Sequence, residues 1–181
     1  MSTLHIFDFD DTLVRADDKI RITHADGASE SLSSEEFAKY VEQPGDQYDF
    51  SDFDQYPTNP TIVENVFAEL RAAIALDGPG SVVILTARSN TKPVIEFLKD
   101  NDIEGIAIVG TASDNPMRKA QYVLDRVKNG DYKEVRVFED NARNIRTIRK
   151  VIEPTGIRLQ TNRVTKRGVV SETRRSRLAT D

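Results

Sequence analysis

Short apolar runs alternate along this chain with longer segments in which apolar residues recur at helical spacing. The apolar runs, short and nearly continuous as in buried strands, cover 4–7, 82–85, 106–110 and 135–138. The segments with helical spacing cover 62–74, 92–101, 115–127 and 142–152. Strands joined by helices of this length favour right-handed crossovers and a parallel sheet covered on both faces. The pattern therefore predicts an α/β fold with a doubly wound, Rossmann-like parallel sheet, in which residues 157–164 add a last edge strand.

The segment between the first strand and the first long helix has a different pattern. Residues 19–23 alternate polar and apolar side chains, a turn signal follows at 25–27, and residues 30–32 can return as a second strand. We expect a small hairpin here, followed by a helix over 33–41. With the loop that follows, these elements form a small hairpin/helix cap insertion over about residues 14–58.

Residues 44–58 form a long loop without periodicity, rich in Asp, Gln and aromatic residues. Loops of this length inside a compact domain are often lids or binding segments. The aromatic residues are Tyr48, Phe50, Phe53 and Tyr56. They can stack on a base or a sugar, although aromatic side chains more often anchor a loop to the body of a domain. Asn59-Pro60 then predicts the start of the next helix.

Length and composition limit the possible classes of protein. The 181 residues, 38% of them apolar, fit one domain with a full core, which we place at residues 1–164. The absence of cysteine excludes disulfides, thiolate zinc sites and cysteine nucleophiles. The two histidines, His5 and His24, are isolated and indicate neither a zinc site nor a catalytic triad. Without a signal-peptide pattern or an apolar stretch of membrane-spanning length, we expect a cytoplasmic protein with no membrane contact.

The formal net charge of −5 argues against a generally basic, nucleic-acid-coating surface. The charge is uneven, because residues 165–181 carry five basic and two acidic side chains. This segment has a balance of +3 and leaves −8 for residues 1–164. A basic segment of low apolar content predicts a disordered tail, and a contact with nucleic acid or an acidic partner is the less favoured interpretation.

Three acids, Asp8, Asp10 and Asp11, follow the first apolar run within four residues. In open α/β sheets ligands bind beyond the carboxyl ends of the strands, so the sequence places these acids at the mouth of a site. A cation or a proton must offset their mutual repulsion. Oxygen ligands at this density favour a hard ion such as Mg²⁺. The alternative is that the acids form a solvated turn or a helix cap.

Polar residues also stand at the ends of other predicted strands. Thr86 follows the second strand and Glu139-Asp140 follows the fourth. Arg118 and Lys119 lie in the first turns of the helix after the third strand. Because the strand ends of a parallel sheet meet at one edge, these side chains can converge on a single phosphoryl group.

The order and content of these strand ends resemble the haloacid dehalogenase-like (HAD) superfamily of phosphohydrolases, and within it the small-cap phosphatases. Residues 8–12, Asp-Phe-Asp-Asp-Thr, match the first motif of that superfamily, DxDx(T/V). The later motifs are matched by Thr86 for the second, Lys119 for the third, and Glu139-Asp140 with Asn144 for the acidic fourth. The resemblance covers about residues 3–150 and rests on the combination of motifs.

The resemblance implies a role for each residue. Asp8 attacks phosphorus and forms an aspartyl-phosphate, while Asp10 protonates the leaving oxygen and then deprotonates the attacking water. Thr86 and Lys119 bind phosphate oxygens, and Lys119, favoured over its neighbour Arg118, also offsets the acids. A Mg²⁺ cofactor is held by Asp8, by the backbone carbonyl of Asp10 and by Asp140.

Two features depart from the motifs or stand beside them. Glu139-Asp140 departs from the paired-Asp form of the fourth motif, which leaves Asp140 ahead of Glu139 as the direct metal ligand. Asn144 stands where some members have a second Asp. Arg88 and Arg143 lie next to motif residues and either grip other groups of the substrate or are solvated or ion-paired.

Two other classes of protein compete with a phosphatase. A receiver-type phosphoacceptor also uses an aspartyl-phosphate, a Thr and a Lys around Mg²⁺, but its accepting Asp lies on a middle strand before them. In this chain the last acid, Asp140, follows Thr86 and Lys119. A non-catalytic binding module of the same fold is the second alternative. Its fold alone does not require the complete set of Asp8, Asp10, Thr86, Lys119 and Asp140, so the presence of the set argues against it.

The resemblance also bears on the substrate. A small cap leaves the site open, so small phosphomonoesters, nucleotides included, and a nucleic-acid 3′-phosphate end are all allowed. Thr86-Ala87-Arg88 is similar to the second motif of small phage-type members, and a further similarity is to the phosphatase part of polynucleotide kinase-phosphatases. No Gly-rich nucleoside-triphosphate loop ending in Lys-Ser/Thr is present, which excludes a fused kinase.

Overall fold

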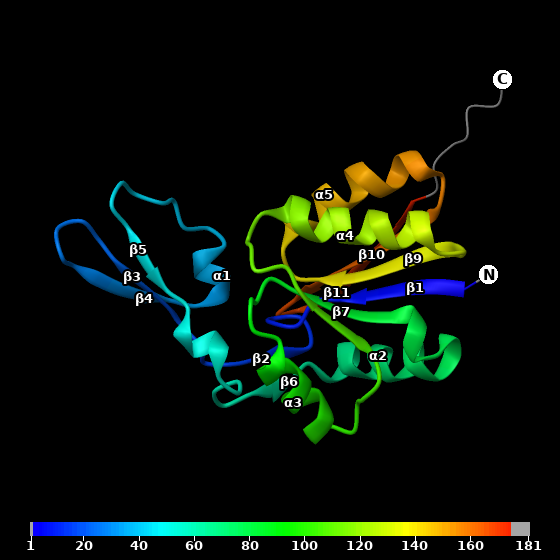
Figure 1. Ribbon diagram of the computed structural model, residues 1–181, viewed down its shortest axis with the longest axis horizontal. Coiled ribbons are helices and arrows are strands. Elements are labelled where there is room, and N and C mark those ends of the chain that lie inside the picture. The colour runs from blue at the N-terminus through cyan, green and yellow to red at the C-terminus, as the bar shows by residue number, and fades with distance from the viewer. Residues whose placement is uncertain (1, 175–181) are drawn as a thin grey trace.

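The central element is a six-stranded sheet in which every neighbouring pair of strands but one is parallel (Figure 1). The computed structural model describes residues 2–174. The strand order is β11-β10-β9-β1-β7-β8. The strands are β1 (Ser2–Phe7), β7 (Val82–Thr86), β8 (Ala107–Gly110), β9 (Tyr132–Glu139), β10 (Arg158–Thr165) and β11 (Gly168–Arg174). The strands predicted from the apolar runs are thus confirmed, and β1 lies between β9 and β7.

Helices flank the sheet on both faces, which makes this a mixed α/β architecture (Figure 1). The helices are α2 (Glu64–Asp77) and α3 (Lys92–Asp100) on one face, and α4 (Pro116–Asn129) and α5 (Ala142–Ile152) on the other. Alternate residues of β1 supply the two cores, because Leu4 and Ile6 pack toward α4 and α5 while Phe7 packs toward α2 and α3. Within residues 2–174, no helix combines the length and apolar character needed to cross a bilayer.

The cap lies beyond the carboxyl ends of the parallel strands, on the left of Figure 1. Its three-stranded antiparallel sheet has the order β4-β3-β5. The cap elements are β3 (Ile20–Thr23), β4 (Ser29–Leu32), α1 (Ser34–Phe37), β5 (Gln47–Asp49) and the 3-10 helix η1 (Ser51–Asp54). The predicted hairpin is confirmed, but the segment predicted to be only a loop adds β5 and η1. The predicted helix over 33–41 ends at Phe37, and Ser33 and Glu36 form a capping box at its start.

The prediction that Asn59-Pro60 begins a helix is wrong. These residues precede the short strand β6 (Thr61–Ile62), which pairs antiparallel with β2 (Val14–Arg15). Asn59 has a φ of 47°, so it turns the chain instead of capping a helix. Helix α2 begins only after Val63. The pairing of β2 with β6 brings the two ends of the cap insertion together at its base.

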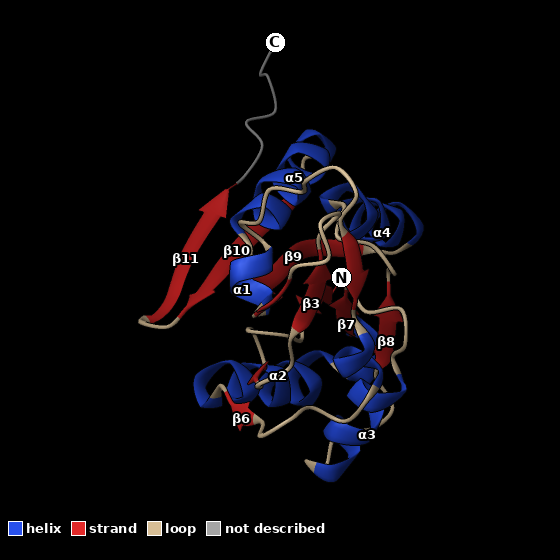
Figure 2. Cartoon of the chain, turned by 90° about the vertical axis from the view of Figure 1, so that its left-hand side faces the viewer, coloured by secondary structure: helices blue, strands red, loops and turns tan. Residues whose placement is uncertain are grey.

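The prediction of a disordered tail from residue 165 is also wrong for the part that the structure describes. Residues 168–174 form β11, which pairs antiparallel with β10 and is the true edge of the sheet (Figure 2). β10 is therefore an inner strand. Ion pairs from Glu172 to Arg149 and from Arg174 to Glu153 tie β11 to neighbouring elements. Residues 175–181, the rest of that prediction, lie outside the described residues.

Candidate active site

The residues predicted from the strand ends line one pocket between the sheet and the cap. The pocket has a volume of about 640 Å³, and its lining includes Asp8, Asp10, Thr86, Lys119 and Asp140. The strand pairing explains the convergence, because Phe7 of β1 is paired with Phe138 of β9 and with Ile84 of β7. The carboxyl ends of these three strands therefore lie at the same edge of the sheet.

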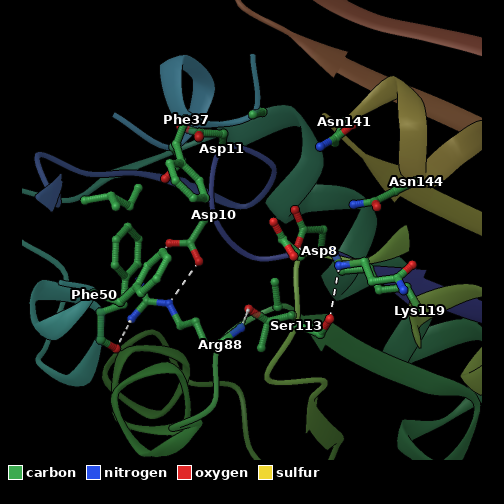
Figure 3. Close-up of a pocket in the computed structure, with 18 of the residues that line it drawn as sticks. Asp8, Asp10, Asp11, Phe37, Phe50, Arg88, Ser113, Lys119, Asn141 and Asn144 are labelled. Carbon is green, nitrogen blue, oxygen red and sulfur yellow. Dashed lines mark hydrogen bonds and ion pairs between the residues drawn. The ribbon is translucent and has the colours of Figure 1, made fainter. Parts of the chain in front are cut away.

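A buried ion-pair cluster forms the floor of this pocket (Figure 3). The Nζ of Lys119 donates to Asp8 Oδ1 and to Glu139 Oε2, both at 2.8 Å. All three side chains are at least 90% buried. Lys119 reaches them because α4 starts at Pro116, where the side chain of Asn115 caps the helix by accepting from the N–H of Met117. Buried charges persist only when they are paired, so this cluster is built around its lysine.

A tight turn after β1 holds the acidic residues in place. The N–H of Asp8 still donates to the carbonyl of Phe138, which continues the ladder with β9. The chain then folds back, with the N–H of Leu13 on the carbonyl of Phe9 at 2.9 Å. Asp11 has a φ of 62°, a conformation that Asp tolerates better than most residues. Asp8 therefore stays paired with the sheet, while Asp10 and Asp11 lie in the turn beyond the end of β1.

Thr12 and Asp140 complete the cluster. Thr12 Oγ1 lies 3.4 Å from Asp8 Oδ2 and 3.3 Å from Asp140 Oδ1, so one hydroxyl stands between the two carboxylates. Glu139 Oε1 accepts from the N–H of Asn141 at 3.0 Å, which leaves its other oxygen for Lys119. The sequence motif contains Thr12, but its place between the two acids could not be read from spacing alone.

The guanidinium of Arg88 is paired with Asp10. Its Nε and Nη2 donate to the two oxygens of Asp10 at 2.9 and 2.7 Å, and its Nη1 donates to the carbonyl of Phe53 at 2.9 Å. The same guanidinium lies 5.3 Å from the ring centroid of Phe9 and 5.0 Å from that of Phe53. Of the two interpretations left open by the sequence, the structure shows the ion pair. Arg88 thereby joins the core strand β7 to Asp10 and to the cap.

The other candidates lie around or away from the pocket. Arg143 and Asn144 line it, whereas Arg118 is exposed and is not part of the lining. His5 is buried in β1 with its Nε2 2.7 Å from Asp77 Oδ2. The Nδ1 of His24 lies 2.7 Å from Asp46 Oδ1 within the cap. Both histidines are therefore paired with acids, in keeping with structural roles.

The cluster carries more negative charge than its one lysine can balance. Burial, and next the Glu139 carboxylate, raise the pKa of Asp8 to about 6 even though Lys119 lowers it. Burial also opposes ionisation of Glu139, but the Lys119 ammonium outweighs it and lowers the pKa of Glu139. Burial, then Glu139 and Asp8, raise the pKa of Asp140 to about 11. Asp140 thus holds a proton at neutral pH when no metal is bound.

The donor set fits a hard divalent cation. Asp8, Glu139 and Asp140 each offer a carboxylate oxygen, and the three oxygens lie within 4.8 Å of one another. Carboxylate oxygens are ligands that Mg²⁺ and Ca²⁺ prefer, and a cation here can replace the proton on Asp140. The side chain of Asp10 is turned to Arg88 and lies outside this cluster. The structure thus groups Glu139, which the sequence ranked behind Asp140, with the other possible ligands, while the identity of the ion stays a prediction.

The affinity for Mg²⁺ should rise with pH, since the ion competes with the proton on Asp140. Between about pH 6 and 9, below the raised pKa of Asp140, we expect an increase of up to about tenfold per pH unit. Calorimetric titration in two buffers of different ionisation enthalpy measures both the affinity and the proton released. The variant Asp140→Asn should bind more weakly and with little pH dependence. A wild-type affinity independent of pH, with no proton release, would contradict this competition.

Comparisons with known proteins identify no relative. No protein-family model, no curated protein and no solved structure matches this chain at a significant level. The geometry of the pocket and the motifs in the sequence are therefore the basis for proposing a function.

Proposed function

We propose that this protein is a Mg²⁺-dependent phosphomonoester hydrolase of the haloacid dehalogenase-like type, acting through an aspartyl-phosphate on Asp8. The observation that carries the proposal is the buried bridge from Lys119 to Asp8 and Glu139, with Thr86 and Asp140 lining the same pocket. The ammonium group of Lys119 is fixed beside two carboxylates and lines the pocket. This arrangement suits the binding and transfer of a phosphoryl group.

The fold supports this proposal. The strand order is compatible with a doubly wound, Rossmann-like sheet, because β7 and β8 extend it on one side of β1 while β9 and β10 extend it on the other. The order reverses at β1, and ligands of such sheets bind at the carboxyl ends of the strands beside the reversal. Asp8 at the end of β1 and Glu139 at the end of β9 stand at that point.

In the first proposed step an oxygen of Asp8 attacks phosphorus, the ester P–O bond breaks, and Asp10 gives its proton to the leaving oxygen. Lys119 and Thr86 bind the phosphoryl oxygens and hold the phosphorus in line. In the second step water attacks the same phosphorus, Asp10 accepts a proton from that water, and Asp8 is released as the carboxylate. Arg88 donates to both oxygens of Asp10 and so fixes the position of that carboxyl group beside the reacting phosphate.

The metal ion, when bound, supplies charge neutralisation at the phosphoryl oxygens. Asp8, Glu139 and Asp140 would hold it, and the hydroxyl of Thr12 lies between the carboxylates of Asp8 and Asp140. The protein itself positions the phosphate and moves the protons.

The direct test is phosphate release from a panel of phosphomonoesters with Mg²⁺ or with EDTA. The panel contains p-nitrophenyl phosphate, sugar phosphates, nucleoside monophosphates and a 3′-phosphorylated oligonucleotide. We expect Mg²⁺-dependent release from at least one class, and none in EDTA. No release from any of them, together with a stable phosphoryl adduct on Asp8 after incubation with acetyl phosphate, would overturn the hydrolase and favour a phosphoacceptor.

A further inference from the structure

Three aromatic rings of the cap, those of Phe37, Tyr48 and Phe50, form a cluster that lines the pocket. The ring centroids of Phe37 lie 5.6 Å from Tyr48 and 5.5 Å from Phe50, both nearly perpendicular, and Tyr48 lies 6.1 Å from Phe50. Figure 3 shows Phe37 and Phe50 on the side of the pocket opposite Lys119. We call these three residues the aromatic platform. Because the rings brace one another, the platform presents fixed apolar surface to the pocket.

The platform does not anchor the cap to the core. Neither core cluster of the described residues contains its three rings. Other residues of the same segment do the anchoring, since Tyr56 packs on Phe97 and donates to Asp100, and Phe53 holds Arg88. Phe50 keeps 47% of its surface exposed although it lies against the pocket. The platform therefore has ring surface that no part of the described chain covers.

The same pocket is lined by the platform and by the buried cluster around Lys119, which binds the phosphate in the proposed mechanism. Its volume of about 640 Å³ lies within the range of small-molecule sites and far exceeds the needs of one phosphate group. A ligand that uses both ends carries a phosphate at one end and a flat, apolar-faced group at the other. Stacking on aromatic side chains is the general way in which proteins hold nucleobases.

The charge around the pocket argues against a longer nucleic acid. Five acids line it outside the buried cluster: Asp10, Asp11, Glu42, Asp54 and Asp114. Of its three cationic residues, Lys119 and Arg88 are ion-paired, and Arg143 makes no ion pair within residues 2–174. Tracking a phosphodiester backbone requires a positively charged groove. This lining instead suits a ligand with a single phosphate. Lys119 and a metal ion at the neighbouring carboxylates would together neutralise that phosphate.

We propose that the substrate is a nucleoside monophosphate, with its base stacked on the aromatic platform and its phosphate between Asp8, Thr86 and Lys119. This inference rests on the proposed phosphatase function and narrows it. It favours a mononucleotide over a nucleic-acid 3′-phosphate end, which the sequence left open.

The test compares kcat/KM for adenosine 5′-monophosphate and ribose 5-phosphate, which share the ester but differ in the base. We expect the wild type to prefer the nucleotide by at least about tenfold, in line with the stacking energy of one base. Phe50→Ala should bring this ratio close to one. Leu76→Ala, an exposed apolar position on α2 outside the pocket, should leave the ratio unchanged. An equal loss on both substrates in Phe50→Ala would show a structural role and overturn the platform.

The outcomes separate this inference from the proposed function. Hydrolysis of p-nitrophenyl phosphate with no preference between the two substrates would overturn the nucleotide assignment and leave the phosphatase intact. Faster release from a 3′-phosphorylated oligonucleotide than from nucleoside 3′- and 5′-monophosphates would overturn it in favour of a nucleic-acid end. If nothing is hydrolysed, the phosphatase fails, and calorimetry decides the nucleotide assignment. Binding of adenosine 5′-monophosphate at least about tenfold tighter than ribose 5-phosphate would support it, and equal or absent binding would overturn it.

Discussion

Replacement of Asp8 by Asn is expected to abolish phosphate release, with kcat reduced by about 10³-fold or more. The carboxamide is close in shape to the carboxylate but does not attack phosphorus, so no aspartyl-phosphate forms. The fold should survive, because the Asn carbonyl oxygen can still accept from Lys119 and one of the repelling carboxylates is removed. The measurement is kcat on the best substrate of the panel, with the melting temperature recorded for the same preparation.

A matched control lies three residues further along the chain. Asp11→Asn makes the same chemical change at a pocket residue that is not part of the metal-ligand cluster. Asn tolerates the positive φ of that position, so this variant should fold and lose at most about tenfold in kcat. If Asp8→Asn retains the activity of Asp11→Asn while both are folded, Asp8 is not the nucleophile.

The parallel sheet and its helices could be predicted because each is specified by local pattern. Asn115-Pro116 predicts the start of α4, and the structure places the cap of that helix there. The Asn59-Pro60 pair begins no helix, because the pairing of Ile62 with Val14 takes the following residues into a strand. That pairing joins positions far apart in sequence, and no local pattern reveals it.

The sequence does not predict the edge strand β11, for a different reason. β11 pairs with a strand on one side only, and its residues from Val170 onward are exposed. It therefore lacks the apolar run that marks buried strands. A polar, partly basic edge strand has the same composition as a disordered tail. What distinguishes them here is the antiparallel register with β10 and the ion pairs of Glu172 and Arg174, which are tertiary features.

The site was predictable to the level of which residues meet, and less so to the level of which atoms pair. The order of the motifs predicts that Asp8, Lys119 and Asp140 meet at one edge of the sheet. In the structure all three line the same pocket. The sequence does not predict the bidentate pair of Arg88 with Asp10, because it leaves Arg88 as either a substrate ligand or a solvated or ion-paired residue. Its partner depends on how the turn after β1 aims Asp10, and on the position of the cap carbonyl of Phe53.

The second large effect is expected from Lys119→Met, which removes the only cation of the buried cluster among the described residues. Asp8 and Glu139 then remain buried without a counter-charge, and breaking such a pair costs about 3–5 kcal/mol of unfolding free energy. The effect should be largest in EDTA, and Mg²⁺ should recover part of it by taking over the charge balance. Denaturant unfolding at neutral pH with and without Mg²⁺ measures both quantities.

The second substitution Glu139→Gln distinguishes lost charge balance from lost packing. In the Lys119→Met background it removes one orphaned carboxylate, so the double variant should be more stable in EDTA than Lys119→Met alone. In the wild-type background the same change breaks a buried ion pair and should destabilise the protein. Opposite signs in the two backgrounds are the expected coupling between neighbouring charges. If Glu139→Gln destabilises both proteins equally, Lys119 contributes packing and not charge, and its proposed role in neutralising the phosphoryl site loses its physical basis.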